Sequence, residues 1–216
     1  MTVAVFPPAL LRQAHDRLWA RLSPEQIQER IHNQLCQANL SLGYQRCTFD
    51  TLDPSQDPEA FQVCRAYAEQ GQYQGRKGLI LAGTPGNGKT SLAVAILRRT
   101  VEQTQGRYSV RFWNVPAGLA QLRQQIETPD PQADSILSLT HNRLLVLDDL
   151  GKQKMSEWVG EQFYLLLNTL CTQEKQVIIT TNLALSRLFQ RLDPALVSRL
   201  TKLCHPVALK GADRRL

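Results

Sequence analysis

The sequence has no long hydrophobic run and no pair of cysteines at metal-binding spacing. No apolar stretch approaches the roughly 20 residues that a membrane-spanning helix needs. Residues 1–11 also lack the basic start and long apolar core of a secretion signal. The five cysteines are odd in number and contain no Cys-x-x-Cys pair, which argues against a disulfide framework and against a zinc site. We therefore expect a cytoplasmic protein with free thiols.

Length and composition are those of a globular protein without internal repeats or low-complexity segments. The 216 residues are 43% hydrophobic, which suffices for one full core with at most a small appendage. The net charge of +6 is compatible with a polyanionic partner such as nucleic acid, but many other proteins carry a similar excess. Charge alone therefore leaves nucleic-acid binding undecided.

From residue 44 onward, short apolar runs alternate with segments of helical periodicity. Runs that are apolar throughout are typical of strands buried on both faces. The alternation predicts a parallel sheet with helices on both faces, a three-layer α/β/α arrangement. The predicted strands are residues 79–82, 110–114, 144–147, 177–180 and, as a fifth, 204–209. The predicted helices are residues 58–71, 89–103, 117–127, 157–171 and 185–192.

Residues 8–40 depart from this pattern and are predicted to form two helices. Ser23, Pro24 and Gln26 make an N-capping signature for the second helix. We place the boundary near residues 41–48, which gives an N-terminal helical region, 1–43, and an α/β domain, 44–216. Apolar side chains of the first region either bind a partner protein or pack on the α/β domain. These side chains are Leu18, Trp19, Leu22 and Ile27.

A glycine-rich segment follows the first predicted strand and precedes a helix. It reads Gly83-Thr84-Pro85-Gly86-Asn87-Gly88-Lys89-Thr90, with Ser91 next, and fits the pattern G-x-x-x-x-G-K-[ST]. Glycines let successive backbone N–H groups point at phosphate oxygens, and a helix N-terminus favours an anion. In this chemistry Lys89 reaches the β- and γ-phosphates, and the Thr90 hydroxyl ligates Mg²⁺. The alternative is a turn without a ligand, but the flanking strand and helix favour a nucleoside-triphosphate site.

Polar residues also end two other predicted strands. Asp148 and Asp149 follow the apolar run 144–147, where a buried carboxylate is costly unless a cation compensates it. Mg²⁺ would do so at Asp148, while Asp149 can orient or deprotonate the attacking water. Asn182 ends the fourth strand at the same edge of the sheet, where it can contact the γ-phosphate or that water. The alternative is that all three are ordinary strand-end or loop-capping residues.

Together these elements resemble the AAA+ ATPases, and closely the DnaC/IstB-like family of helicase loaders and transposition helpers. The resemblance covers residues 45–216. It rests on the P-loop, on Leu-Leu-Val-Leu-Asp-Asp-Leu-Gly at 144–151, on Ile-Ile-Thr-Thr-Asn at 178–182, and on Ser-Arg-Leu at 198–200. It implies a P-loop AAA+ fold with a parallel five-stranded sheet and a minimal lid. It also implies ATP and Mg²⁺ as ligands, and slow, oligomer-dependent ATP hydrolysis.

The resemblance assigns roles to further residues. Asn182 resembles the sensor 1 residue, Arg215 the sensor 2 residue, and Asn114 lies where AAA+ proteins place a polar switch residue. Arg199 resembles the arginine finger, which acts on the ATP of a neighbouring subunit; an ordinary surface ion pair is the alternative. An arginine acting in trans requires a head-to-tail contact, which builds rings or filaments. We therefore expect a homo-oligomer that forms on ATP and DNA.

Three functions are compatible with this resemblance. The first, which we favour, is a DnaC-like helicase loader in DNA replication that engages the replicative helicase and single-stranded DNA. The second is an IstB-like transposition helper that remodels target DNA. The third is a nucleotide-gated binding module with negligible turnover, which the intact P-loop and acidic pair disfavour. Lys152, Lys154 and Arg123 are the candidate DNA contacts, or else ordinary solvated charges.

Overall fold

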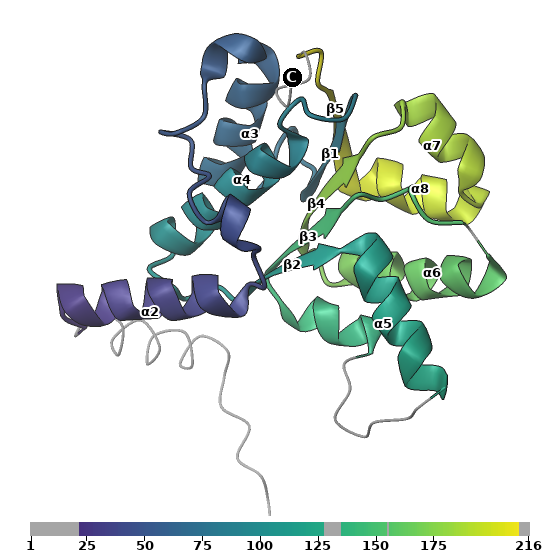
Figure 1. The fold of residues 1–216 in the computed structure, drawn as a ribbon, viewed down its shortest axis with the longest axis horizontal. Coiled ribbons are helices and arrows are strands. Elements are labelled where there is room, and N and C mark those ends of the chain that lie inside the picture. Colours follow the sequence, from purple (N-terminus) through teal and green to yellow (C-terminus); the bar gives the residue numbers. More distant parts are fainter. Residues whose placement is uncertain (1–21, 128–134, 155, 212–216) are drawn as a thin grey trace, which may run out of the picture.

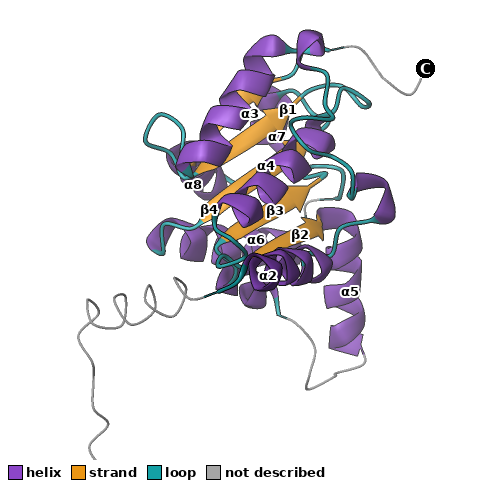
Figure 2. Ribbon diagram, turned by 90° about the vertical axis from the view of Figure 1, so that its left-hand side faces the viewer, coloured by secondary structure: helices purple, strands orange, loops and turns teal. Residues whose placement is uncertain are grey.

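A five-stranded parallel sheet forms the centre of the protein (Figure 1). The computed structural model describes residues 22–127, 135–154 and 156–211. The strand order is β2-β3-β4-β1-β5, and all neighbouring strands pair in parallel. Their arrowheads therefore meet at one edge of the sheet (Figure 2). The strands are β1 (Gly78–Ala82), β2 (Val110–Asn114), β3 (Leu144–Asp148), β4 (Gln176–Thr181) and β5 (Cys204–Ala208).

Helices cover both faces of the sheet, because successive strand side chains point to opposite faces. In β3, Leu144 and Val146 pack with α2, α3 and α4, whereas Leu145 and Leu147 pack with the helices of the other face. The α-helices are α2 (Pro24–Gln37), α3 (Pro58–Gln70), α4 (Lys89–Gln103), α5 (Val115–Glu127), α6 (Glu157–Thr172), α7 (Leu185–Arg191) and α8 (Pro194–Leu203). Short 3-10 turns are η1 (Leu42–Tyr44), η2 (Pro54–Gln56) and η3 (Ile136–His141).

The predicted fold class, a three-layer α/β/α fold with a parallel five-stranded sheet, is confirmed. The fifth strand lies beside β1, with Gly78 opposite Cys204. α8 was not predicted from the sequence, although Asp193 caps its N-terminus through a 2.8 Å hydrogen bond from Ala195 N–H. None of the helices within the described ranges is both long and apolar enough to cross a membrane.

The N-terminal helix α2 lies against the α/β domain beside β2 (Figures 1 and 2). Ser23 and Gln26 form the predicted capping box at its start. At its end Ala38 is fully buried, and Phe112 N–H donates to Ala38 O at 2.7 Å. The side chain of Leu35 packs against the same hydrophobic cluster. The division into regions 1–43 and 44–216 stays a prediction, and the helix expected before Leu22, including Leu18 and Trp19, lies outside the described residues.

The layered core makes a direct prediction about stability. Leu145 is fully buried in the middle of β3, so Leu145→Ala should lower the free energy of unfolding by about 2–5 kcal/mol through the cavity it leaves. Leu42→Ala removes the same atoms from a side chain that is 83% exposed, and should change stability by less than about 0.5 kcal/mol. Urea unfolding of both variants checks this. Equal losses would contradict the placement of Leu145.

Candidate functional site

The glycine-rich segment forms a loop between β1 and α4 that only glycine-containing sequence can adopt. Gly88 is the N-cap of α4 and has φ +89°, a left-handed conformation that side chains disfavour. A Cβ at Gly83 would overlap the side chain of Asn87 and the carbonyl of Leu209. The loop therefore turns tightly and ends at the N-terminus of α4. Backbone N–H groups of such a loop and of the first helical turn together are suited to bind phosphate.

Lys89 lies inside this loop and is only 4% exposed. Its ammonium donates hydrogen bonds to Thr84 O at 2.6 Å and to Asn87 Oδ1 at 3.0 Å. Asn87 in turn donates from Nδ2 to Leu209 O at 3.2 Å, which joins the loop to the residue that follows β5. The loop thus holds the Lys89 ammonium in place, and its positive charge lies inside the loop, where phosphates would bind.

Asp148 is the centre of a hydrogen-bonded cluster at the carboxyl edge of the sheet. Its Oδ1 accepts hydrogen bonds from Thr90 Oγ1 at 2.8 Å and from Thr180 Oγ1 at 2.7 Å. Asn114 Nδ2 approaches its Oδ2 at 3.5 Å. Burial raises the pKa of Asp148 above its usual value, although the hydrogen bonds from both hydroxyls oppose this shift. A nearby cation would stabilise such a carboxylate.

The chemistry of this cluster fits Mg²⁺. Hard cations bind oxygen, and Mg²⁺ takes one or two protein oxygens together with phosphate oxygens and water. The hydroxyl of Thr90 and the carboxylate of Asp148 are adjacent, at the start of α4 and beside the phosphate loop. These two residues would therefore hold Mg²⁺ together with a nucleotide.

Asp149 is held in place by three contacts. Its backbone has φ +63°, an uncommon conformation for a residue with a side chain, and its N–H donates to Thr180 Oγ1 at 3.0 Å. Its carboxylate accepts a hydrogen bond from Asn182 Nδ2 at 2.8 Å and forms an ion pair with Lys152 Nζ at 3.3 Å. The turn at Asp149 thereby directs its carboxylate toward Asn182 at the end of β4.

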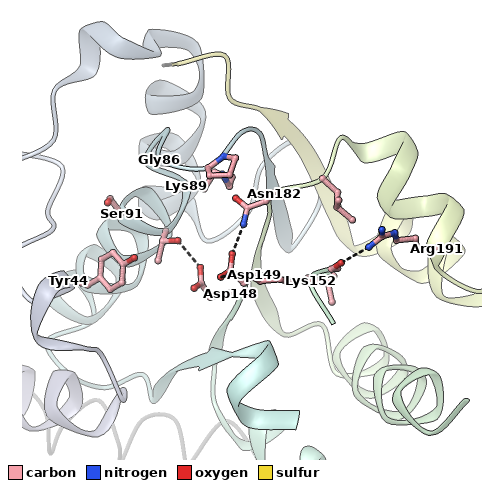
Figure 3. A pocket seen from close by; sticks show the side chains of 15 residues that line it. Tyr44, Gly86, Lys89, Ser91, Asp148, Asp149, Lys152, Asn182 and Arg191 are labelled. Atoms are coloured by element: carbon pink, nitrogen blue, oxygen red, sulfur yellow. Dashed lines mark hydrogen bonds and ion pairs between the residues drawn. The ribbon is translucent and has the colours of Figure 1, made fainter. Parts of the chain in front are cut away.

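These residues surround one cavity of about 580 Å³, shown in Figure 3. Nine predicted site residues line it: Pro85, Gly86, Gly88, Lys89, Thr90, Ser91, Asp148, Asp149 and Asn182. Gly83, Thr84 and Asn87 build the base of the loop through the contacts described above. Lys152, a candidate DNA contact, also lines the cavity.

Other predicted residues lie away from the cavity. Arg199 is on α8 and contacts α6 instead. Asn114 does not line the cavity itself but contacts Asp148, which does, and its role as a polar switch residue stays a prediction. Arg123 lies over the ring of Trp158, with Cζ 5.3 Å from the ring centroid. Arg215 lies outside the described residues.

Five cavity residues were not predicted as site residues from the sequence: Tyr44, Leu150, Gly151, Leu183 and Arg191. Leu150, Gly151 and Leu183 directly follow predicted residues, whereas Tyr44 and Arg191 come from distant segments. Tyr44 comes from η1, before the α/β core begins, and reaches the side of the cavity near Ser91 (Figure 3). Arg191 ends α7 and donates from Nη1 to Gly151 O at 3.0 Å. No local motif marks Tyr44 or Arg191, because both enter the site through the tertiary arrangement of distant segments.

Comparisons with known proteins identify a family and solved structures with a similar fold. The family model described as IstB-like ATP binding protein matches residues 22–216. The crystal structure of the DnaC helicase loader matches with a TM-score of 0.68 and 25% identity, covering 79% of this chain and 100% of that chain. A DnaI crystal structure gives 0.66 and 21%, covering 82% and 95%. Domain III of the Thermotoga maritima replication initiation protein DnaA gives 0.65 and 21%, covering 79% and 68%. The comparison with curated proteins gives no significant match.

The raised pKa of Asp148 predicts how stability depends on pH without Mg²⁺ and ATP. The folded protein binds this proton more tightly than the unfolded chain, so it loses stability as the pH rises from below 3.8 through the raised pKa. Asp148→Asn keeps an oxygen acceptor for both hydroxyls but removes the buried charge. We therefore expect Asp148→Asn to be more stable than the wild type at neutral pH, and equally stable in acid.

Urea unfolding at several pH values with EDTA present measures this difference. Asp50→Asn, at an exposed aspartate, is the matched control and should follow the wild type at each pH. A variant Asp148→Asn that is less stable than the wild type at neutral pH would show that the carboxylate is stabilising without a cation.

Proposed function

The chain belongs to the family of IstB-like ATP-binding proteins, and we propose that it is a Mg²⁺-dependent ATPase of the helicase-loader type. The observation that carries the proposal is the cavity at the carboxyl edge of the sheet. There the loop that fits phosphate, the Thr90–Asp148 pair and the Asp149–Asn182 pair all face one space. A binding module without turnover would not need the second carboxylate and its amide partner.

Each part of the cavity has a separate role in hydrolysis. The loop N–H groups and Lys89 would bind the triphosphate and neutralise charge on its β- and γ-oxygens. Thr90 and Asp148 would hold Mg²⁺, which supplies charge stabilisation to the phosphates when bound. Asp149 would orient the attacking water and accept its proton. Asn182 donates to Asp149 Oδ1 at 2.8 Å, so its amide can hold that carboxylate in place. The same amide could instead donate a hydrogen bond to the γ-phosphate when ATP is bound.

We assign the arginine finger to Arg199, acting on the site of a neighbouring copy. Arg199 is not among the residues that line the cavity of its own chain. Its guanidinium is held against α6 instead, so we propose that it acts on a triphosphate that another subunit presents. A head-to-tail arrangement of this kind continues from copy to copy and builds a ring or a filament.

The proposed partners are the replicative helicase and single-stranded DNA. The structure of the DnaC helicase loader, 25% identical to this chain, supports the first. For the second, Lys152 and Lys154 follow the acidic pair, and their exposed charges suit a phosphate backbone. The region that we expect to engage the helicase is 1–43, through the apolar residues Leu18, Trp19, Leu22 and Ile27.

The alternative is a transposition helper, which the match to the IstB-like family model favours. The same ATPase cavity serves both functions, so the partner must decide between them. Affinity capture with the purified replicative helicase should retain this chain in the presence of ATP. No helicase binding, together with stimulation of a transposase, would overturn the loader assignment.

The finger assignment predicts how turnover depends on protein concentration. In the wild type, turnover per subunit should rise with protein concentration. In Arg199→Ala, turnover should be as low as in Lys89→Ala. Binding of a fluorescent ATP analogue should be lost in Lys89→Ala but kept in Arg199→Ala, because Arg199 lies outside the chain's own cavity. Arg191→Ala tests the arginine that lines that cavity. Concentration-independent turnover that depends on Arg191 and not on Arg199 would contradict a finger acting in trans.

The Lys152–Asp149 ion pair predicts how DNA changes the rate. A DNA phosphate that binds Lys152 would remove this cation from the carboxylate that orients water. We therefore expect Lys152→Ala to abolish the effect of saturating single-stranded DNA on turnover. Lys154→Ala, a lysine of the same loop, should only raise the DNA concentration needed. If both variants merely shift that concentration, Lys152 does not connect DNA to catalysis.

A further inference from the structure

The guanidinium of Arg199 is held by two side chains of α6. Its Nη2 donates to Tyr164 Oη at 2.8 Å and to Asn168 Oδ1 at 3.2 Å, and its Nε donates to Asn168 Oδ1 at 3.3 Å. Nη1 donates to Ala195 O, one turn earlier on α8, at 3.0 Å. The guanidinium also lies over the ring of Tyr164, with Cζ 4.1 Å from the ring centroid. All three guanidinium nitrogens are therefore positioned by the chain itself.

Every one of these partners is uncharged. A phenol, an amide and a backbone carbonyl accept the hydrogen bonds, and within the described ranges no carboxylate forms an ion pair with Arg199. Neutral acceptors fix the orientation of the guanidinium without cancelling its charge. A rigid, charged fork of this kind is suited to an oxyanion such as a phosphate.

The surface beside Arg199 is suited to contact with another protein. Tyr164 and Leu165 are 42% and 46% exposed, although both are large and apolar. With Leu196 of α8 they border a groove of about 620 Å³ along α6. The two helices lie side by side (Figure 1), so Arg199 sits at the margin of an exposed apolar surface. If a neighbouring copy covers this surface, Arg199 lies at the edge of the contact.

We propose that Tyr164 and Asn168 are positioning residues for Arg199. They hold its guanidinium in the orientation in which it contacts the triphosphate bound by a neighbouring copy. This rests on the proposed function, because it requires that Arg199 acts in trans. Neither side chain lines the cavity of its own chain, so neither contacts a nucleotide bound there, and the contact of both with Arg199 is their link to hydrolysis in a neighbouring copy.

The test compares Tyr164→Ala, Asn168→Ala and Arg199→Ala, each alone and mixed in equal amounts with Lys89→Ala. Alone, the two positioning variants should lose about 10- to 100-fold in kcat, as expected for a misplaced catalytic group, and keep the wild-type affinity for an ATP analogue. Mixed with Lys89→Ala, they should regain turnover, because Lys89→Ala donates an intact Arg199 to their intact ATP sites. Tyr164→Phe keeps the stacked ring and loses Oη, so it should lose less than Tyr164→Ala.

Thr172→Ala, one turn beyond Asn168 on α6, is the control and should keep the wild-type rate. Suppose that Tyr164→Ala and Asn168→Ala keep the wild-type kcat, while Arg199→Ala is inactive and is restored by mixing. This result would overturn the positioning role but leave the trans finger in place. Loss of kcat that mixing restores for Arg199→Ala but not for these two would show a structural role, and would also overturn it. Wild-type kcat in Arg199→Ala would overturn the trans finger itself.

Discussion

The structure depends on one buried carboxylate, that of Asp148, which accepts hydrogen bonds from the hydroxyls of Thr90 and Thr180. These bonds join the end of β3 to the first turn of α4 and to β4, so three elements that are distant in sequence are fixed around one oxygen. Placing a carboxylate at the end of a fully apolar strand costs stability, which the raised pKa expresses. This cost in stability falls at the position where we propose that Mg²⁺ binds.

The positions of several other residues of the proposed site follow from this cluster. Thr180 also accepts the N–H of Asp149, and this contact supports the left-handed turn that aims the second carboxylate at Asn182. The glycine-rich loop and Lys89 line the same cavity as Asp148 and Asp149. Arg199, by contrast, is held on the outer surface of α8 by neutral contacts from α6. One chain thus contains a nucleotide pocket and, at a separate place, a charged group suited to the pocket of another copy.

The sheet and the core of the site could be predicted because their signals are local. Continuous apolar runs mark the strands, and the glycine pattern and the Asp148–Asp149 pair mark strand ends that parallel pairing brings to one edge. α8 was not predicted, although Asp193 and Pro194 signal its start and Leu196, Leu200 and Leu203 recur at helical spacing. Tyr44, Arg191 and the Lys152–Asp149 pair could not be predicted, because their contacts depend on the backbone turn at Asp149 and on how η1 and α7 pack.

The most direct test of this account is the Mg²⁺ dependence of ATP affinity in the wild type and in Asp148→Asn. Titration with a fluorescent ATP analogue, in Mg²⁺ and in EDTA, gives both affinities without requiring turnover, oligomers or a partner. The account predicts that the wild type binds more tightly in Mg²⁺ and that Asp148→Asn loses most of this difference while it keeps the affinity measured in EDTA. An equal Mg²⁺ effect in both proteins would contradict the assignment of the buried carboxylate as a cation site.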